Sequence, residues 1–207
     1  MSSTGRKAGL LGDMDRVLSS SGTRTGAASI ARALQMVITR PGPLAVILYR
    51  LSHALWQRHL SFLAEIVWRV NFGLTGADIH PAARIAGGLR MPHTSGIVIG
   101  RDVAIDHNVT LMQGVTLGGS GRQFFDPDFV DGHPRIGDHT WVMAHASILG
   151  PISVGPRCMI GAGSVVTKDL PAGTVLSTGR ELSDLRKRVE SLERRLAETE
   201  PTPDRRN

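Results

Sequence analysis

From Ile79 onward the sequence repeats every six residues, and this repeat constrains the fold more than any other feature. Units such as I-G-R-D-V-A, I-D-H-N-V-T and L-M-Q-G-V-T open on an aliphatic residue, and a small or β-branched residue often follows four places later. About a dozen such units keep the register as far as Pro171. The pattern predicts a β-helix in which each hexad forms a short strand and a turn, and three hexads form one triangular coil. Coils of this kind are left-handed, an exception to the usual right-handed crossover.

Two breaks interrupt the register. Two extra residues, Ile97 and Val98, follow the unit M-P-H-T-S-G, which predicts a local distortion of the coil next to His93. A loop is expected over residues 118–135, where three phenylalanines and three aspartates replace the hexad pattern: Phe124, Phe125, Phe129, Asp126, Asp128 and Asp131.

The segments outside the repeat are helical or flexible in the prediction. Residues 28–75 show apolar residues at helical spacing, with Pro43 in a first turn and with Gly73 and Gly76 at the end. The predicted domains are a flexible N-terminus over 1–27, an α-helical domain over 28–75, the β-helix over 76–178, a coiled-coil helix over 179–199 and a disordered tail over 200–207. The fold class is therefore mainly β: a left-handed parallel β-helix with a helical domain before it and a coiled-coil helix after it.

The coiled coil is inferred from a heptad seam near the C-terminus. Apolar residues recur at spacings of 3, 4, 3 and 4 with charged residues between them, at Leu182, Leu185, Val189, Leu192 and Leu196. Two to three heptads are too short for a stable isolated helix, so pairing with copies of the same chain is expected. The alternative is one amphipathic helix lying on its own domain.

Composition limits the cellular setting and the partners. The single cysteine, Cys158, fits a reducing compartment, and its place in the hexad predicts an inert buried thiol. No apolar run has the length of a membrane span, so a cytoplasmic protein without a membrane partner is expected. The net charge of +6 comes mainly from residues 1–77, which hold nine basic and three acidic residues. These arginines are scattered without aromatic residues among them, which favours a solvated helix surface over a nucleic-acid site.

Several segments together resemble the serine acetyltransferase family. The matching segments are G-A-D-I-H-P-A-A-R-I (76–85), H-T-S-G-I-V-I-G (93–100), N-V-T-L-M-Q-G-V-T-L-G-G (108–119), H-P-R-I-G-D (133–138) and I-G-A-G-S-V-V-T-K-D-L-P (160–171). The resemblance implies a homotrimer of β-helices, which the helical domains can join into hexamers, with acetyl-CoA bound between neighbouring β-helices. It also implies direct acetyl transfer to a hydroxyl without an acyl-enzyme or a metal, and a place in cysteine biosynthesis.

The resemblance also assigns catalytic roles. His93 matches the family's general base, which takes the proton of the acceptor hydroxyl as that hydroxyl attacks the thioester. Asp78 matches the carboxylate that orients the base, and at fifteen residues' separation the two are expected on neighbouring faces or adjacent rungs. His133 matches a second histidine that contacts the acceptor. The residues that match the CoA-binding side, including the amides facing the thioester, are Gly118, Gly119, Ala144, Gly161, Ala162, Gly163 and Lys168.

Other positions depart from the family pattern where the acceptor would bind. The family usually has aspartate where this chain has Pro92 and arginine where it has Gly132, so the usual readers of an ammonium and a carboxylate are missing. Phe129 and Asp131 are candidate acceptor-binding residues, because the loop suggests a pocket wall; the alternative is an aromatic anchor that only packs the loop. The acceptor is therefore either L-serine, with groups such as Arg122 or Asp131 as replacements, or an altered hydroxyl or amine.

Two alternatives to an acetyltransferase remain at this stage. One is a catalytically silent trimeric scaffold, which the retention of both candidate histidines disfavours. The other is a zinc hydratase resembling γ-class carbonic anhydrases, suggested by His133, His139 and His145 at intervals of six. Six residues make one face, so these three side chains are expected on different faces and not around one metal. The family tail that ends in isoleucine and docks a sulfhydrylase has no match in the closing D-R-R-N.

Overall fold

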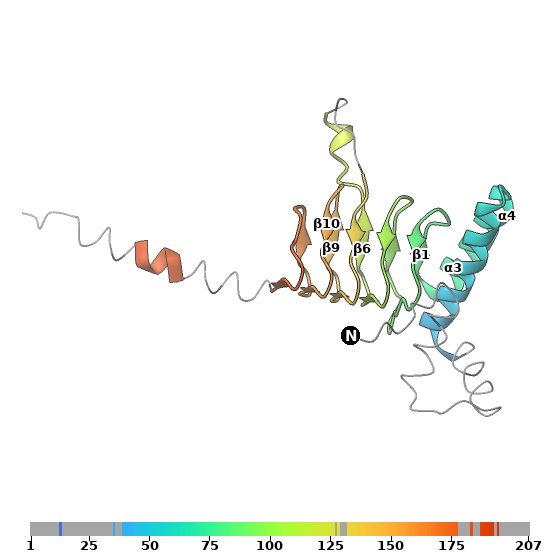
Figure 1. The fold of residues 1–207 in the computed structure, drawn as a ribbon, viewed down its shortest axis with the longest axis horizontal. Coiled ribbons are helices and arrows are strands. Elements are labelled where there is room, and N and C mark those ends of the chain that lie inside the picture. Colours follow the sequence, from blue (N-terminus) through green and yellow to red (C-terminus); the bar gives the residue numbers. More distant parts are fainter. Residues whose placement is uncertain are drawn as a thin grey trace, which may run out of the picture. The chain divides into compact units, whose positions relative to one another are not determined.

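Two helices followed by short parallel strands make up the main folded unit (Figure 1). The computed structural model describes residues 13, 35, 39–126, 128, 132–177, 183, 187–192 and 194, and it divides the chain into units Met1–Leu176 and Ser177–Asn207. The elements of the first unit are α3 (Pro41–Gln57), α4 (Ser61–Thr75), β1 (Asp78–Ile79), β2 (Arg84–Ile85), β3 (Val98–Ile99), β4 (Ala104–Ile105), β5 (Thr110–Leu111), β6 (Thr116–Gly118), the 3₁₀-helix η1 (Arg122–Phe124), β7 (Arg135–Ile136), β8 (Trp141–Val142), β9 (Ser147–Leu149), β10 (Ser153–Val154), β11 (Met159–Ile160), β12 (Val165–Val166) and β13 (Val175–Leu176).

The strands form three parallel sheets, which are the three faces of a triangular β-helix. Sheet A has the order β1-β3-β6-β9-β12, sheet B has β10-β7-β4-β2, and sheet C has β13-β11-β8-β5. Val98 pairs with Thr116, so a regular coil takes 116 − 98 = 18 residues, or three hexads. Thr110 pairs with Trp141, 31 residues on, because the coil between them contains the long loop after β6. The predicted hexad coils are therefore confirmed.

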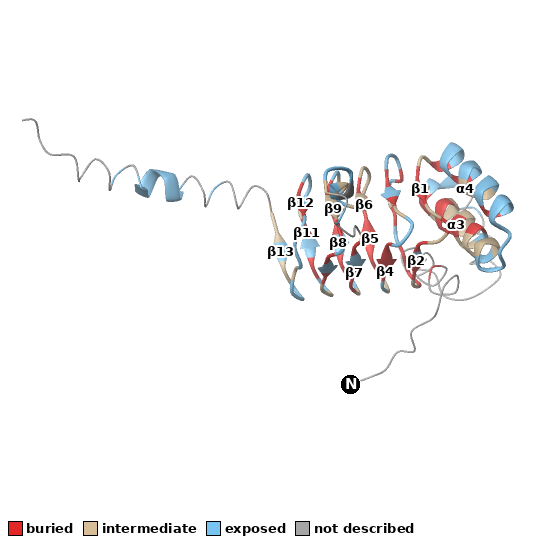
Figure 2. Ribbon diagram, turned by 90° about the horizontal axis from the view of Figure 1, so that it is seen from above, coloured by how far each residue is buried: buried red, intermediate tan, exposed pale blue. Residues whose placement is uncertain are grey.

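The interior of the β-helix is a stack of aliphatic side chains, one from each hexad opening. All of these residues are at most 7% exposed: Ile79, Ile85, Met91, Ile99, Ile105, Leu111, Leu117, Ile136, Val142, Ile148, Val154, Ile160 and Val166. Figure 2 shows the same alternation, with buried positions along the inside of the strands. Cys158 is 2% exposed, as its hexad position predicts. Burial of such side chains contributes about 1.5–3 kcal/mol each, which makes this stack the main source of stability.

The predicted distortion near His93 is present and can be located. Asp78 pairs with Val98, so the coil between them has 98 − 78 = 20 residues, two more than a regular coil. Ile97 is fully buried in the inward place that precedes a hexad opening, and the turn before it is at Ser95 and Gly96. The extra residues therefore fall within 92–94, and the corner that carries His93 is longer than the others.

The turns between strands stack into three edges of the β-helix. The A–B edge consists of residues 80–83, 100–103, 119–134, 150–152 and 167–169. The B–C edge consists of residues 86–89, 106–109, 137–140, 155–158 and 171–174. The C–A edge consists of residues 91–97, 112–115, 143–146 and 161–164. Because each coil repeats the path of the one before it, the edge on which a residue lies follows from its place in the repeat.

The helices pack at the β1 end of the β-helix. Helix α3 begins at Pro41, two residues before the proline that the sequence favoured, and α4 continues through Gly73. Gly76 ends α4 in the left-handed conformation with a φ of 71°, which glycine adopts without steric cost. Asn71 is buried, and its side-chain amide donates to the carbonyl of Ala45, which fixes α4 against α3.

Asp13 is buried against the first coil, although residues 1–27 are predicted to be flexible; nearly all of that segment lies outside the described residues. Its carboxylate accepts hydrogen bonds from the backbone N–H groups of Gly88 and Leu89 and pairs with the Arg50 guanidinium at 2.8 Å. The same guanidinium donates to the carbonyls of Ile85 and Ala86. The pair therefore has its charges and donors matched, which a buried ion pair requires.

The second unit carries part of the heptad seam. Residues 187–192 are helical, and Val189 and Leu192 are about half exposed, at 51% and 55%. Leu182, Leu185 and Leu196 lie outside the described residues, so the coiled coil stays a prediction.

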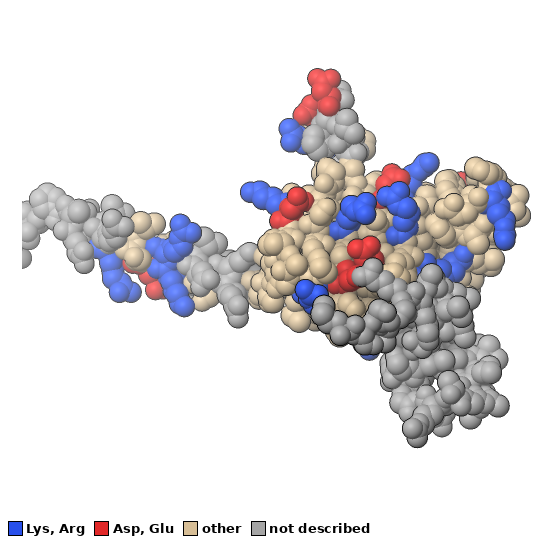
Figure 3. Space-filling model, in the orientation of Figure 1, with Lys and Arg blue, Asp and Glu red and all other residues tan. Residues whose placement is uncertain are grey.

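Charged side chains of both signs are interspersed over the face shown in Figure 3. No broad field of one sign covers the β-helix on that face. Among the residues that the structure describes, none of the helices has the length and apolar character needed to cross a bilayer.

Tyr49 provides a spectroscopic test of the helix–β-helix junction. Its buried hydroxyl donates to the carbonyl of Ala83, and burial raises its pKa from 10 to about 12. Because the folded pKa is above the unfolded one, this hydroxyl stabilises the fold below pH 10, and the contribution is lost as pH rises through about 12. Tyr49 is the only tyrosine, so tyrosinate absorbance should show a midpoint near 12 in the folded protein and near 10 in denaturant.

Tyr49→Phe is the control, because it should remove the absorbance transition from both titrations. Circular dichroism at each pH establishes that the protein is still folded. A midpoint near 10 in the folded protein would contradict burial of this hydroxyl.

Candidate active site

Asp78 is held at the junction of α4 and sheet A. It is half-buried on β1, and its Oδ1 atom accepts a hydrogen bond of 2.8 Å from the indole Nε1–H of Trp68. This bond leaves Oδ2 available to another donor. No hydrogen bond joins Asp78 to His93 within the chain, so the predicted pair of carboxylate and base stays a prediction.

His80 lies beside this carboxylate and is kept neutral. Its Nδ1 accepts a hydrogen bond from the backbone N–H of Ala82, which assigns the proton to Nε2. The imidazole lies 4.9 Å from the Trp68 ring and 5.6 Å from the Trp56 ring. Burial lowers the pKa of His80, and the positive charge of Arg101 lowers it further. His80 therefore supports Trp68 as a packed, neutral residue, in agreement with the structural role that its sequence position suggests.

His93 stands on the C–A edge with its side chain exposed. Its corner contains the extra residues, and Thr94 next to it is buried, with its hydroxyl donating to the carbonyl of Thr75. Within the part of the chain that the structure describes, His93 has no hydrogen-bond or ion-pair partner. An exposed imidazole without an internal partner is free to act on a bound ligand.

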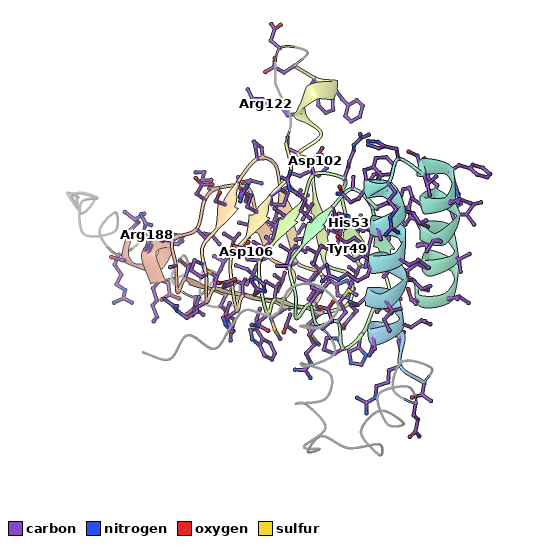
Figure 4. The ribbon with its side chains drawn as sticks, turned by 45° about the vertical axis from the view of Figure 1, so that its right-hand side comes forward. Tyr49, His53, Asp102, Asp106, Arg122 and Arg188 are labelled. Carbon is purple, nitrogen blue, oxygen red and sulfur yellow. The ribbon has the colours of Figure 1, made fainter. Side chains whose placement is uncertain are left out.

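His133 stands on the A–B edge, where the long loop rejoins the β-helix. Its Nδ1 lies 3.7 Å from Oδ2 of Asp102, close enough for an ion pair when the imidazole is protonated. Its ring lies against Gly100, where an added Cβ atom would come within 2.6 Å of Cδ2. Figure 4 shows Asp102 on the β-helix below the projecting loop that carries Arg122. Gly100 therefore makes room for the His133 ring in its observed position.

The predicted site residues divide between two edges of the β-helix. The C–A edge carries Pro92, His93, Ala144, Gly161, Ala162 and Gly163, whereas the A–B edge and the adjoining end of β6 carry Gly118, Gly119, Gly132, His133 and Lys168. Sheet A separates the two groups, and Asp78 lies on it. One chain thus brings together neither the two candidate histidines nor all of the predicted CoA-binding residues.

His145 is a further residue on the C–A edge. Its backbone φ is 59°, and its ring covers Gly114, where an added Cβ atom would lie 2.2 Å from Nδ1. The imidazole thus lies on the same edge as Ala144 and the glycines of residues 161–163. This is the position from which a narrowing of the CoA groove is predicted.

The loop after β6 projects from the β-helix (Figure 1). Phe124 and Phe125 are 81% and 91% exposed, so these two rings are not anchors that pack the loop. Arg122 pairs with Asp126 at 3.2 Å and is 62% exposed, so its charge is already matched within the loop. Phe129 and Asp131, the candidate acceptor-binding residues of this loop, lie outside the described residues.

The three histidines at intervals of six do not converge within the chain. His133 lies on the A–B edge, His139 on the B–C edge and His145 on the C–A edge, as the spacing predicts. In the described ranges, no three His, Cys, Asp or Glu side chains are grouped so that they could hold a metal ion.

Sequence reasoning missed the partners of the predicted residues. Trp68 and Asp102 hold Asp78 and His133, yet neither belongs to a recognisable motif. The aromatic content of only 4% was a usable signal, because a tryptophan ten residues before Asp78 on a predicted helix stands out in such a chain. Asp102 gave no signal of its own, since aspartate is common at hexad corners.

Comparisons with known proteins agree with this architecture. Residues 133–168 match the family model described as bacterial transferase hexapeptide (six repeats). A serine acetyltransferase of Bacillus pumilus is 43% identical over 138 residues, which are 67% of this chain and 61% of that protein. A serine acetyltransferase of Helicobacter pylori is 41% identical over 140 residues, which are 68% of this chain and 79% of that protein. The crystal structure of Neisseria gonorrhoeae serine acetyltransferase in complex with serine superposes with a TM-score of 0.67 at 32% identity, covering 80% of this chain and 63% of that one.

The stacked coils and the matched model define a left-handed β-helix of the hexapeptide-repeat transferases. Within that class, the chain belongs to the serine acetyltransferase family. It spans about three fifths of the length of the Bacillus pumilus relative.

Gly100→Ala tests the position of the His133 ring. The new methyl group would overlap this ring, so the imidazole must rotate away, and overpacking should lower the free energy of unfolding by about 1–3 kcal/mol. The NMR signals of the His133 ring should shift, and denaturant unfolding should show the loss. Gly73→Ala is the matched control, because nothing lies within 4 Å of an added Cβ atom there. If Gly100→Ala changed neither property, His133 would not lie against this glycine.

Proposed function

We propose that this protein is an enzyme that transfers the acetyl group of acetyl-CoA to the hydroxyl of L-serine or a related acceptor. The observation that carries the proposal is the arrangement of Asp78, His93 and His133, which match the family's motifs residue by residue. The two histidines stand at surface corners, and the carboxylate is oriented by Trp68. Membership of the family and the serine-bound neighbour support L-serine as the acceptor to test first. The one cysteine is buried, which is consistent with a cytoplasmic location.

The proposed reaction is a direct displacement. The acceptor oxygen attacks the acetyl carbonyl carbon, and His93 takes the hydroxyl proton as the new C–O bond forms. The tetrahedral oxyanion is stabilised by backbone N–H groups near Gly118 and Gly119. The C–S bond then breaks, and the CoA sulfur leaves with the proton that the imidazolium returns. The products are an acetyl ester and free CoA, so no other reactant is needed.

The division of the site between two edges supports a site between subunits. A C–A edge of one subunit facing the A–B edge of another would place His93, Ala144 and Gly161 opposite His133, Gly119 and Lys168. Acetyl-CoA would then lie in the groove between the two β-helices. Three such contacts close a ring, which is the trimer that the family resemblance implies.

Sheet C carries apolar surface that suits such an assembly. Trp141, Met159 and Val175 are adjacent in register on its outer face and are 40%, 47% and 57% exposed. The outer positions of sheet B are different, with exposed Arg84, Arg135 and Ser153. Contiguous exposed apolar side chains usually mark an interaction surface. We therefore place sheet C, and not sheet B, nearer to the subunit contact.

The central experiment measures thiol release from acetyl-CoA with L-serine and with other alcohols and amines. His93→Ala should lower kcat by about 10²–10⁴-fold while acetyl-CoA affinity stays unchanged, because the imidazole acts on the proton and not on the CoA chain. Calorimetry on the same preparation measures acetyl-CoA binding.

His107→Ala is the matched control, because it removes an imidazole from a corner of the B–C edge, away from the proposed site. Full turnover in His93→Ala would place the base elsewhere. If the wild-type protein binds CoA but releases no thiol with any acceptor, it is a scaffold and not an enzyme.

A site between subunits predicts complementation between two inactive variants. When His93→Ala and His133→Ala chains are mixed, denatured and refolded together, about a quarter of the interfaces should receive both wild-type histidines. Turnover should therefore recover to about a quarter of the wild-type rate, whereas either variant refolded alone stays inactive. Absence of recovery in mixed trimers of confirmed mass would place both histidines in a site within one chain.

A further inference from the structure

A pocket opens beside Asp78, at the junction of α4 and β1. It has a volume of about 240 Å³ and is lined by Trp68, Arg69, Phe72 and Asp78. The walls are two aromatic rings, and the charged groups are one guanidinium and one carboxylate. A pocket of this size is suited to a small metabolite, for which apolar walls and a few placed polar groups are typical.

Arg69 is the cation of this pocket, and its charge is available. Its side chain is exposed, and among the described residues it forms no hydrogen bond or ion pair. Other arginines of the chain differ, since Arg50 pairs with Asp13, Arg122 pairs with Asp126, and Arg101 lies over the Trp56 ring. A guanidinium that presents a planar fork of N–H donors into a pocket is suited to a carboxylate.

The same pocket contains the carboxylate of the proposed reaction. Trp68 fixes Oδ1 of Asp78, and Arg69 is the next residue on α4. The side chain that holds Asp78 and the side chain that provides the positive charge are therefore adjacent on one helix. A ligand bound by Arg69 would have its remaining atoms next to Asp78.

The corners that read the acceptor's charges in the family cannot do so here. Pro92 and Gly132 carry no charge, and the Arg122 guanidinium, the replacement that the sequence suggested, is already paired with Asp126. An acceptor with a carboxylate still needs a cation, because a carboxylate taken from water without a partner is strongly unfavourable.

We propose that Arg69 binds the carboxylate of the acceptor, and that the acceptors are therefore small hydroxy acids, including hydroxy amino acids. Trp68 and Phe72 pack against the body of the acceptor. The inference rests on the proposed acetyl transfer for its kinetic test, but the binding of the carboxylate is measurable without turnover.

The experiment compares L-serine with L-serinamide, which has the same hydroxyl and ammonium but no carboxylate. The kcat/KM of the wild-type protein should be about 10–100-fold higher for L-serine, as expected for a charge-assisted hydrogen bond. In Arg69→Gln this preference should fall to about onefold, with the kcat/KM for L-serinamide and the KM for acetyl-CoA unchanged. Arg69→Lys should restore part of the preference, since it keeps the charge but loses the fork.

Arg84→Gln is the matched control, because it removes an exposed guanidinium from the outer face of sheet B and should keep the full preference. An equal preference for L-serine in Arg69→Gln and in the wild-type protein would overturn the proposal. So would a wild-type protein that turns over both acceptors equally.

Calorimetric binding of L-serine separates this inference from the proposed function. If the wild-type protein releases no thiol but binds L-serine, and Arg69→Gln weakens that binding about 10–100-fold, then the acetyl transfer fails while the carboxylate site stands. If the wild-type protein neither binds nor acetylates L-serine, the carboxylate site is refuted, whatever other acceptor it uses.

Discussion

The stacking of hexad-opening aliphatic side chains inside the β-helix is the interaction on which the rest of the structure depends. Each of these residues touches its equivalents in the coils above and below, so the interior is one continuous apolar column. A shift of one residue would turn a buried isoleucine outward, and the register is therefore fixed by burial alone. Once it is fixed, every turn residue has an assigned edge. The positions of His93 and His133 are consequences of this core and require no separate contact to specify them.

The same rigidity explains why the site is divided. A coil can lengthen at a corner without disturbing the column, as it does by two residues near His93 and by 31 − 18 = 13 residues in the loop after β6. It cannot move a corner from one edge to another. Two histidines that begin on different edges of one β-helix therefore stay apart, and only a neighbouring β-helix can bring an equivalent pair together. Assembly is thus a geometric requirement of the proposed chemistry.

The sequence predicts the parts of the molecule that follow from the repeat. Period, core residues, corner positions and the edges of His133, His139 and His145 all come from counting in sixes, because each depends only on local spacing. The junction with the helices could not be predicted in this way. The bond from Trp68 to Asp78 depends on how α4 is rotated against β1, and the burial of Asp13 depends on a chain segment 75 residues from Gly88. The continuation of α4 through Gly73 shows the same limit, since packing against α3 outweighs the low helix propensity of one glycine.

The junction also determines where acceptor recognition can arise. Corners of the β-helix are short and confined by coils on both sides, so the loss of a charged residue there, as at Pro92 and Gly132, cannot be made good by a neighbour in the same coil. Helix α4 has no such confinement on its outer side, and consecutive positions on it point in different directions. Trp68 can therefore turn toward Asp78 while Arg69 lines the pocket beside it. A change of acceptor reader from corner to helix leaves the column, the edges and the candidate histidines undisturbed, which is why recognition and chemistry can vary separately in this architecture.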